Sequence, residues 1–189
     1  MPPRVKINKD DIISTSITLI RKNGVSELNA RNIASELSCS TQPIFSNFKS
    51  MEDLHEQVTA SAHNLYLEFL QNEAKSGKYP KYKAFGMAYI RFAKDEKELF
   101  KFLFMRDRKN EDLSPTDDFK ASIDIIMKAN GFSREKAELM HMEMWSLVHG
   151  IGTMLATSFC PLKWEKISDM LTDVYQGLRL KHAGEEDKK

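Results

Sequence analysis

The hydrophobic residues of this chain recur at intervals of three and four positions along most of its length. This spacing places apolar side chains on one face of an α-helix, because the helix has about 3.6 residues per turn. No segment shows the strict apolar–polar alternation of a half-buried β-strand. The pattern predicts an all-α protein of about nine helices, over residues 9–23, 30–37, 41–48, 51–74, 81–94, 96–105, 115–130, 134–159 and 162–180.

Residues at the ends of these segments support the predicted boundaries. The side chains of Asn, Ser and Thr favour the N-cap, where they accept a hydrogen bond from a free backbone N–H. Asp95 and Glu98 predict a capping box in which Asp takes the role of Ser or Thr, and Gly24 and Gly131 are typical helix stops. The predicted N-caps are Asn8, Asn29, Ser40 or Thr41, Ser50 and Ser133.

The segment Asn29–Phe48 contains two short helices joined by a tight turn at Ser38–Ser40, after one longer amphipathic helix. This is the arrangement of a helix-turn-helix unit, whose second helix lies in the major groove of DNA. The sequence therefore predicts a helix-turn-helix DNA-binding domain over residues 1–51. A helical ligand-binding and dimerisation domain is expected over residues 52–189.

The charge distribution agrees with this division. Residues 1–50 carry seven Lys or Arg and four Asp or Glu, whereas the rest of the chain carries 21 basic and 23 acidic residues. Positive charge on a DNA-binding domain would lie near phosphates. The difference is small, and ordinary scatter of surface charge is the alternative interpretation.

Composition argues against a membrane or secreted protein. No apolar run approaches the roughly 20 residues that a membrane span needs, and the N-terminal residues lack the apolar stretch of a secretory signal. The two cysteines, Cys39 and Cys160, form no disulfide framework. We therefore expect a reduced, cytoplasmic protein without a membrane partner.

The sequence also lacks the short motifs of common enzyme classes: HExxH, GxSxG, the P-loop and GxGxxG. His141, His149 and Cys160 are separated by eight and eleven positions, which does not match the usual spacing of metal ligands. We expect neither catalysis nor a metal or other cofactor.

Taken together, these features resemble the tetracycline-repressor (TetR/AcrR) family of bacterial transcription regulators. Trp145-x-x-x-His149-Gly150 is similar to the signature of one class of regulatory domain that lies C-terminal to the DNA-binding domain in such proteins. The resemblance implies a homodimer that binds a near-palindromic operator in double-stranded DNA, acts as a repressor, and is released by a small-molecule effector. The segments that carry it are Ile12-Ile13, Asn23-Gly24, Arg31-x-Ile33-Ala34, Ser40-Thr41-Gln42-Pro43-Ile44-Phe45-x-x-Phe48 and Lys49-Ser50-Met51-Glu52-Asp53-Leu54.

The third predicted helix carries the candidate base-reading side chains. Gln and Asn pair bidentately with adenine in the major groove, and the ring of Pro43 is suited to a thymine methyl. Lys49, the Met51 backbone N–H and the Pro2–Lys6 arm are expected near phosphates. Ile44, Phe45 and Phe48 are expected to anchor this helix to the first. The predicted DNA-binding residues are Arg31, Ser40, Thr41, Gln42, Pro43, Phe45, Ser46, Asn47 and Lys49.

Three positions depart from the family pattern. Ser38 stands where the turn usually has Gly. Phe45 replaces a Tyr whose hydroxyl commonly meets a phosphate, and Met51 replaces a Lys that does the same. Two phosphate contacts are therefore missing, so a helical protein-interaction adaptor without specific DNA binding is kept as the alternative function.

The middle of the chain is rich in methionine and aromatic residues, which suit a pocket for apolar ligands. For any one of them, a place in the core is the alternative. His149 is either a ligand contact or a core histidine bonded to a neighbouring helix, and both remain open. The predicted pocket residues are Phe85, Tyr89, Phe92, Phe104, Met105, Met127, Met144, Trp145 and His149.

The last two predicted helices carry the candidate dimer interface. The eighth is apolar on two faces and the ninth has a narrow apolar stripe; a wholly intramolecular core is the alternative. Gly150 and Gly152 each cost about 1 kcal/mol relative to Ala within a helix, which predicts close approach of another helix. The predicted interface residues are Val148, Ile151, Leu155, Trp164, Ile167, Leu171, Val174 and Leu178.

Overall fold

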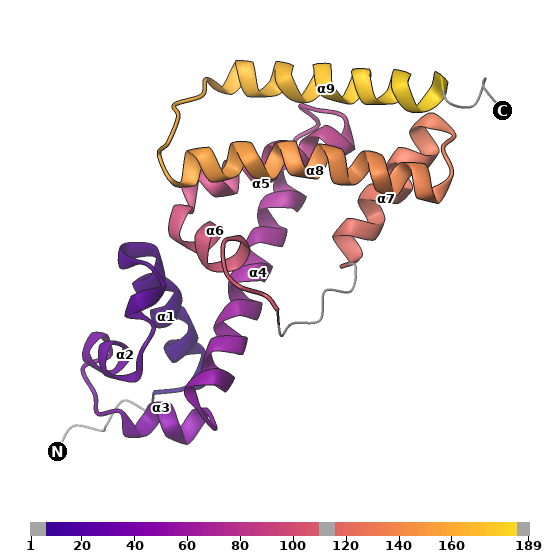
Figure 1. Cartoon of the computed structure of the whole chain (residues 1–189). Coiled ribbons are helices and arrows are strands. Elements are labelled where there is room, and N and C mark those ends of the chain that lie inside the picture. Colours follow the sequence, from indigo (N-terminus) through magenta and orange to yellow (C-terminus); the bar gives the residue numbers. More distant parts are fainter. Residues whose placement is uncertain (1–6, 110–115, 185–189) are drawn as a thin grey trace. The chain divides into compact units, whose positions relative to one another are not determined.

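The computed structural model describes residues 7–109 and 116–184, and the regular structure of these residues is entirely helical (Figure 1). The prediction of an all-α protein is confirmed. No helix among the described residues is long and apolar enough to cross a membrane. The elements are α1 (Lys9–Asn23), a short 3-10 turn η1 (Val25–Glu27), α2 (Ala30–Glu36), α3 (Gln42–Asn47), α4 (Met51–Lys75), α5 (Lys81–Asp95), α6 (Lys97–Phe104), α7 (Asp117–Asn130), α8 (Arg134–Ala156) and α9 (Trp164–Gly184).

Local capping bonds explain where several helices begin. The Asn8 side chain accepts a hydrogen bond from the Asp11 backbone N–H at 2.9 Å, and the Asp11 carboxylate accepts one from the Asn8 N–H at 3.0 Å. Asn29 caps α2 in the same way, accepting from the Asn32 N–H at 3.0 Å. Ser133 caps α8. These N-caps are those predicted from the sequence.

The entrance to α4 is held by a reciprocal pair. The Ser50 hydroxyl accepts a hydrogen bond from the Asp53 N–H at 3.2 Å, and the Asp53 carboxylate accepts one from the Lys49 N–H at 2.9 Å. The second of these bonds lowers the pKa of Asp53 below its usual value, because it stabilises the charged form. The direction of the chain between α3 and α4 is therefore fixed by polar side chains.

The predicted capping box at Asp95 is wrong. Asp95 ends α5, and Glu96 occupies the N-cap of α6 without a side-chain capping bond. The Glu96 carboxylate instead accepts two hydrogen bonds from the Arg21 guanidinium, at 2.7 and 2.9 Å. A partner 75 positions away in the sequence has replaced the local cap.

Other helix ends differ by a few residues. Thr41 stands at the N-cap of α3 but makes no side-chain capping bond. The eighth helix ends at Ala156 rather than near residue 159, because Ser158 adopts a left-handed conformation with φ of 56°. The ninth helix begins at Trp164 and continues to Gly184, beyond the predicted end. The predicted start of the seventh helix at Ser114-Pro115 lies outside the described residues.

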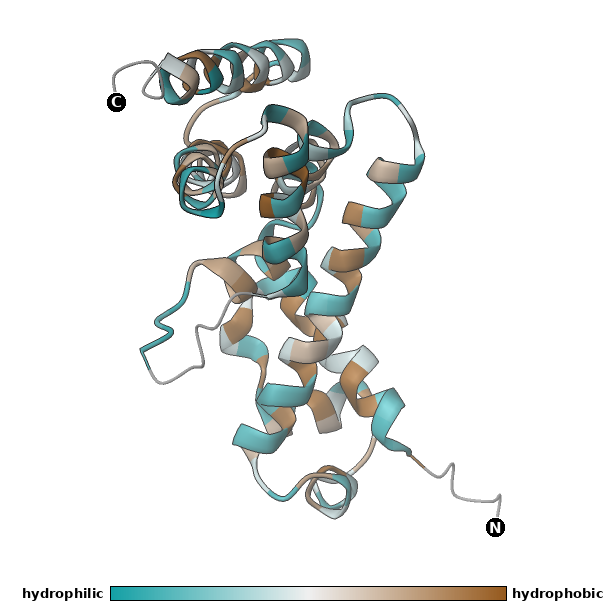
Figure 2. Ribbon diagram, turned by 90° about the vertical axis from the view of Figure 1, so that its right-hand side faces the viewer, coloured by the Kyte–Doolittle hydropathy of each residue, from teal (hydrophilic) through white to brown (hydrophobic). Residues whose placement is uncertain are grey.

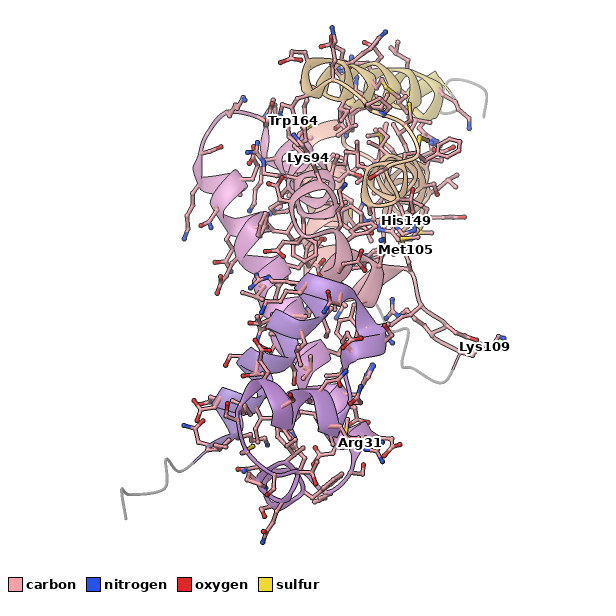
Figure 3. The ribbon with its side chains drawn as sticks, turned by 90° about the vertical axis from the view of Figure 1, so that its left-hand side faces the viewer. Arg31, Lys94, Met105, Lys109, His149 and Trp164 are labelled. Carbon is pink, nitrogen blue, oxygen red and sulfur yellow. The ribbon has the colours of Figure 1, made fainter. Side chains whose placement is uncertain are left out.

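The chain divides into two compact units, each formed by two segments of the sequence. The head unit comprises Met1–Leu67 and Glu96–Arg106, and therefore contains α1 to α3, the first part of α4, and α6. The body unit comprises Glu68–Asp95 and Asp107–Lys189. Among the residues labelled in Figure 3, Arg31 belongs to the head unit, and His149 and Trp164 belong to the body unit.

The head unit has a hydrophobic core to which each of its helices contributes. Apolar positions three and four apart are buried while the polar positions between them are exposed. Figure 2 shows hydrophobic and hydrophilic residues alternating along the helices. The helix α6 contributes Leu99 and Phe100, which are fully buried. In the other helices of the head unit, the aliphatic residues that are at most 1% exposed are Ile12, Ile20, Ile33, Ile44, Leu54, Val58 and Ala62.

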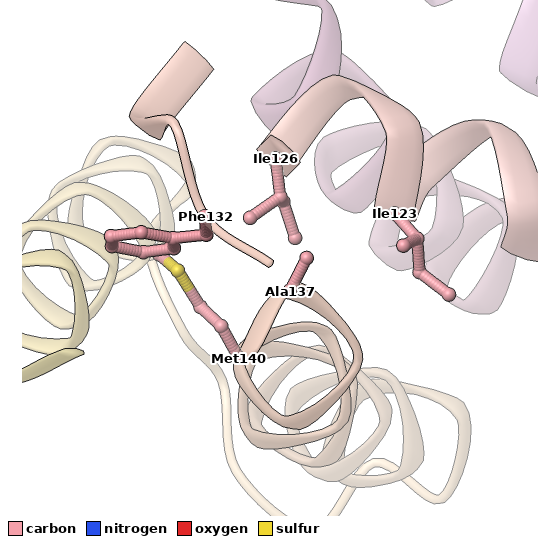
Figure 4. Packing of buried hydrophobic residues seen from close by; sticks show 5 residues of the cluster. All are labelled: Ile123, Ile126, Phe132, Ala137 and Met140. Carbon is pink, nitrogen blue, oxygen red and sulfur yellow. The ribbon is translucent and has the colours of Figure 1, made fainter. Parts of the chain in front are cut away.

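The body unit is centred on α5 and α8. A cluster of buried residues at α7 and the start of α8 is formed by Ile123, Ile126, Phe132, Ala137 and Met140 (Figure 4). A side chain at Gly86 would meet Leu171 at 3.1 Å and Val148 at 3.3 Å, so α5 closely approaches α8 and α9 there. At Gly150 an added Cβ would meet no atom of the described residues within 4 Å, so the predicted close approach at this glycine is not found among them.

Candidate functional site

The helix α3 is held to the head unit by two residues, not by three. Ile44 and Phe48 are 1% and 2% exposed and lie four positions apart on the inner face. Phe45 lies about 100° round the helix from Ile44, and 54% of its surface is exposed. The expectation that Phe45 anchors α3 is therefore wrong, and its ring lies on the outer surface.

The predicted DNA-binding residues lie on consecutive segments of the head unit: α2, the following turn, α3, and the segment before α4. The Arg31 side chain at the start of α2 is labelled in Figure 3. Thr41, Pro43 and Asn47 are half-buried. The exposed members of the set are Arg31, Ser40, Gln42, Phe45, Ser46 and Lys49. Of the other expected phosphate contacts, the Pro2–Lys6 arm lies outside the described residues.

Two polar side chains of α3 form hydrogen bonds with the helix itself. The Ser46 hydroxyl donates to the Gln42 carbonyl at 2.9 Å, and the Asn47 amide donates to the Pro43 carbonyl at 2.8 Å. Such bonds to the preceding turn are common for short polar side chains. They use the Ser46 proton and an amide proton of Asn47, and leave the exposed Gln42 amide as the longest polar side chain of α3.

The turn between α2 and α3 is tight although it has no glycine. Ser38 adopts the left-handed conformation with φ of 51°, where glycine is usually favoured. The Ser38 and Cys39 N–H groups donate to Ser35 and Ala34 carbonyls, at 3.0 and 2.9 Å. These bonds close the end of α2 and offset the backbone strain that Ser38 carries.

In the body unit, α5 and α8 bring three of the predicted pocket residues together. The Tyr89 hydroxyl and His149 Nδ1 form a hydrogen bond of 2.8 Å, and the Trp145 ring stacks on the His149 ring at 4.9 Å with an interplanar angle of 13°. Burial lowers the pKa of His149 and raises the pKa of Tyr89, so both groups are neutral near pH 7. His149 is thus bonded to a neighbouring helix, while 39% of Trp145 is exposed.

A second tyrosine–histidine pair joins the same two helices and was missed by the sequence interpretation. The Tyr82 hydroxyl and His141 Nδ1 form a hydrogen bond of 2.9 Å, and Phe119 packs edge-on against the imidazole at 4.6 Å. Burial lowers the pKa of His141 to about 4, although Asp118 partly opposes this shift. Tyr82 and Tyr89 are seven positions apart, and the two histidines are eight apart. Two helical turns therefore separate the pairs on both helices, a signal already present in the sequence.

The other predicted pocket residues are divided between the two units. Phe104 belongs to the head unit, where its ring packs on Tyr66 at 5.2 Å. Phe92 packs edge-on against Phe69 at 5.2 Å, and Met127 packs against the α7–α8 cluster. The remaining three are Phe85, half-buried on α5, Met144, buried on α8, and Met105, exposed in the head unit.

The described residues contain no group of three or more His, Cys, Asp or Glu side chains placed to hold a metal ion.

Comparison with known proteins gives a match at the level of structure. No family model and no curated protein sequence matches this chain. A TetR-like transcriptional regulator from Rhodococcus sp. RHA1 has a TM-score of 0.63 at 12% identity, over 93% of this chain and 96% of that one. A TetR family member from Streptomyces coelicolor A3 has a TM-score of 0.61 at 15% identity, over 88% and 96% of the two chains.

The chain has the fold of TetR-like transcriptional regulators. A putative transcriptional regulator from Pseudomonas aeruginosa PAO1 shares this TetR-like fold, with a TM-score of 0.69 at 14% identity over 93% of this chain and 92% of that one. The expected fold is therefore confirmed across nearly the whole chain.

Within this TetR-like fold, half of the predicted dimer-interface residues are already covered by their own chain. Val148, Ile151, Ile167 and Leu171 are buried in one copy and have almost no surface left for a partner. Leu155, Trp164 and Leu178 are half-buried, and Val174 is exposed. Leu178 packs on the α7–α8 cluster.

Trp164 also has contacts within its own chain. Its ring lies 4.9 Å from the Arg91 guanidinium and 5.9 Å from the Lys94 ammonium, both on α5. Trp164 and Lys94 are labelled close together in Figure 3. These contacts are what the alternative interpretation, a wholly intramolecular core, predicts for Trp164.

Of the predicted interface set only Val174 is exposed, and the other open apolar surface of α8 and α9 lies outside that set, with Met142 on the second apolar face that the sequence predicted for the eighth helix. Leu139 and Met142 on α8 and Leu180 on α9 are exposed large hydrophobic residues. The three-residue spacing of Leu139 and Met142 was a usable signal, because it places both side chains on one side of the helix.

Proposed function

We propose that this protein is a ligand-responsive DNA-binding transcription regulator that represses its target genes as a homodimer. The observation that carries the proposal is the orientation of α3 within a TetR-like fold. Ile44 and Phe48 hold the helix to the head unit, while Gln42, Phe45 and Ser46 are exposed on its outer side. A helix presented in this way suits the major groove.

In this proposal, α3 reads base edges and its neighbours contact the backbone. The Gln42 amide offers a donor and an acceptor, which match the N7 and N6 groups of adenine. Arg31 at the start of α2 and Lys49 after α3 supply positive charge for phosphates on either side. The protein would thus gain affinity from phosphates and specificity from α3.

The test is a DNA-binding assay on the segment upstream of the protein's own gene, at several salt concentrations. We expect specific binding whose affinity falls steeply with salt, because bound phosphates release counterions. Arg31→Ala should weaken binding and reduce the slope of log K against log salt by about 1. Lys128→Ala, at an exposed position of α7 in the body unit, is the matched control and should leave both unchanged. An affinity that depends neither on the salt concentration nor on the DNA sequence would favour the adaptor function.

The homodimer is proposed because one head makes too few contacts for a specific site, and because Leu139, Met142 and Leu180 leave apolar surface open on α8 and α9. Met142→Asp would place a charge in the interface, so we expect the dimer dissociation constant to rise at least about tenfold. Val25→Asp, at an exposed apolar position of the head unit, is the control. Sedimentation velocity gives the dimer dissociation constant of both variants. An unchanged constant in Met142→Asp would show that this face of α8 is not the dimer interface.

The effector is proposed to bind where Tyr89, Trp145 and His149 meet. Neutral phenol and imidazole groups beside an exposed indole suit an apolar ligand with a few polar atoms. Such a ligand would shift the protein between conformations only by its difference in affinity for them. Since the chain has two tryptophans, the fluorescence of Trp145 in a Trp164→Phe background reports binding at this place.

A further inference from the structure

The outer surface of α3 has few polar groups with which to read DNA. The helix has six residues and no charged side chain. The Ser46 hydroxyl and the Asn47 amide both donate to carbonyls of the same helix, and Asn47 and Pro43 are half-buried. The largest exposed side chains of α3 are therefore Gln42 and Phe45, one polar and one apolar.

Gln42 and Phe45 are neighbours on the surface of α3. Residues three apart on a helix have Cβ atoms about 5–6 Å from each other, and 54% of Phe45 is exposed. Ile44 and Phe48 fill the inner face of α3, so no rotation of the helix could bury Phe45 without exposing them. A large apolar ring is thus fixed beside the amide best placed to read a base.

We propose that Phe45 is a specificity-determining residue that recognises the C5-methyl group of thymine. This inference rests on the proposed DNA-binding function. A phenyl ring can neither donate nor accept an ordinary hydrogen bond, and the thymine methyl is the apolar group that base edges present in the major groove. With Gln42 beside it selecting adenine, the half-site would be read as neighbouring A·T pairs.

The thymine methyl can be removed without changing base pairing, because deoxyuridine differs from thymidine only by that group. The experiment first recovers a preferred duplex by selection from a random-sequence pool with the full-length protein. Each thymine of the half-site is then replaced in turn by deoxyuridine, symmetrically in both halves. Burying one methyl is worth a few-fold in affinity, so two symmetric losses should weaken wild-type binding about tenfold at one position.

Substitutions of single residues show which side chain causes this loss of affinity, the deoxyuridine penalty. Phe45→Ala should bind the thymine and deoxyuridine duplexes equally, whereas Phe45→Tyr, which keeps the ring, should retain the penalty. Pro43→Ala should also retain it, and Val25→Ala is a control at an exposed apolar residue of the head unit. Because Phe45 is exposed, its alanine variant should keep the wild-type melting temperature.

The outcomes separate this inference from the proposed function. If the wild-type protein binds a specific duplex but tolerates deoxyuridine at every position, Phe45 does not read thymine and only this inference is overturned. If the penalty disappears in Pro43→Ala and persists in Phe45→Ala, the methyl is read by Pro43 and the inference is again wrong. If selection recovers no preferred sequence, the proposed function itself fails and the inference fails with it.

Discussion

Replacing Phe48 by alanine is expected to lower the free energy of unfolding by about 3–5 kcal/mol, the usual cost of removing a buried aromatic ring. Phe48 is 2% exposed, and the Lys9 ammonium lies 5.2 Å from its ring centre. The residue also closes α3, since its N–H donates to the Ile44 carbonyl at 3.0 Å. Its loss removes packing at the point where α3 is attached to the head unit. Urea denaturation followed by circular dichroism measures the effect.

Phe45→Ala is the matched control for this substitution. The same side chain is removed three positions earlier on the same helix, but from an exposed position, so the free energy of unfolding should change by no more than about 0.5 kcal/mol. Equal losses in the two variants would show that α3 has a different orientation from the one described. The pair therefore tests the structural basis of the proposed DNA-binding surface without any DNA.

Acid is expected to destabilise the protein through His141. Its pKa is lowered to about 4 by burial in the native state, against about 6.5 in the unfolded chain. Between these values the unfolded state binds more protons, so the free energy of unfolding falls as pH falls from about 6.5 towards 4. The full loss is roughly 3 kcal/mol, at 1.4 kcal/mol per pKa unit. The lowered pKa of His149 acts in the same direction.

The measurement is the midpoint of urea unfolding at pH 7.5, 6.0 and 5.0, for the wild type and for His141→Gln. The variant removes the titrating group, so its stability should depend less on pH between 6.5 and 5, whatever its stability at neutral pH. Ser146→Ala, at an exposed position of α8 without a titrating group, is the control and should keep the wild-type pH dependence. An unchanged pH dependence in His141→Gln would contradict the assignment to the Tyr82–His141 pair.

Those parts of the fold that depend on neighbouring residues could be predicted from the sequence. The caps at Asn8, Asn29 and Ser50 form with backbone groups three positions away, so the local sequence contains all the information. The capping box predicted at Asp95 is wrong for the opposite reason. Glu96 is engaged by Arg21, and no local pattern shows that a charge 75 positions away is a better partner.

The candidate sites could be predicted only in part, because periodicity gives the position of a residue on a helix but not what covers each face. Ile44, Phe45 and Phe48 are all apolar, and the sequence does not say which of them points outward. The same uncertainty affected Val148 and Ile151, which looked available for a partner and are buried within one chain. Predicting the two tyrosine–histidine pairs would have required knowing that α5 packs against α8.

The membership of α6 in the head unit has a consequence for protein engineering. A head exchanged at the junction before α4 would include α1 to α3 but not α6. Here a cut at residue 51 would separate Arg21 from Glu96 and place α1 against the sixth helix of an unrelated protein. A working chimaera of this protein would need to carry over Glu96–Arg106 as well, so the unit of exchange is discontinuous in the gene.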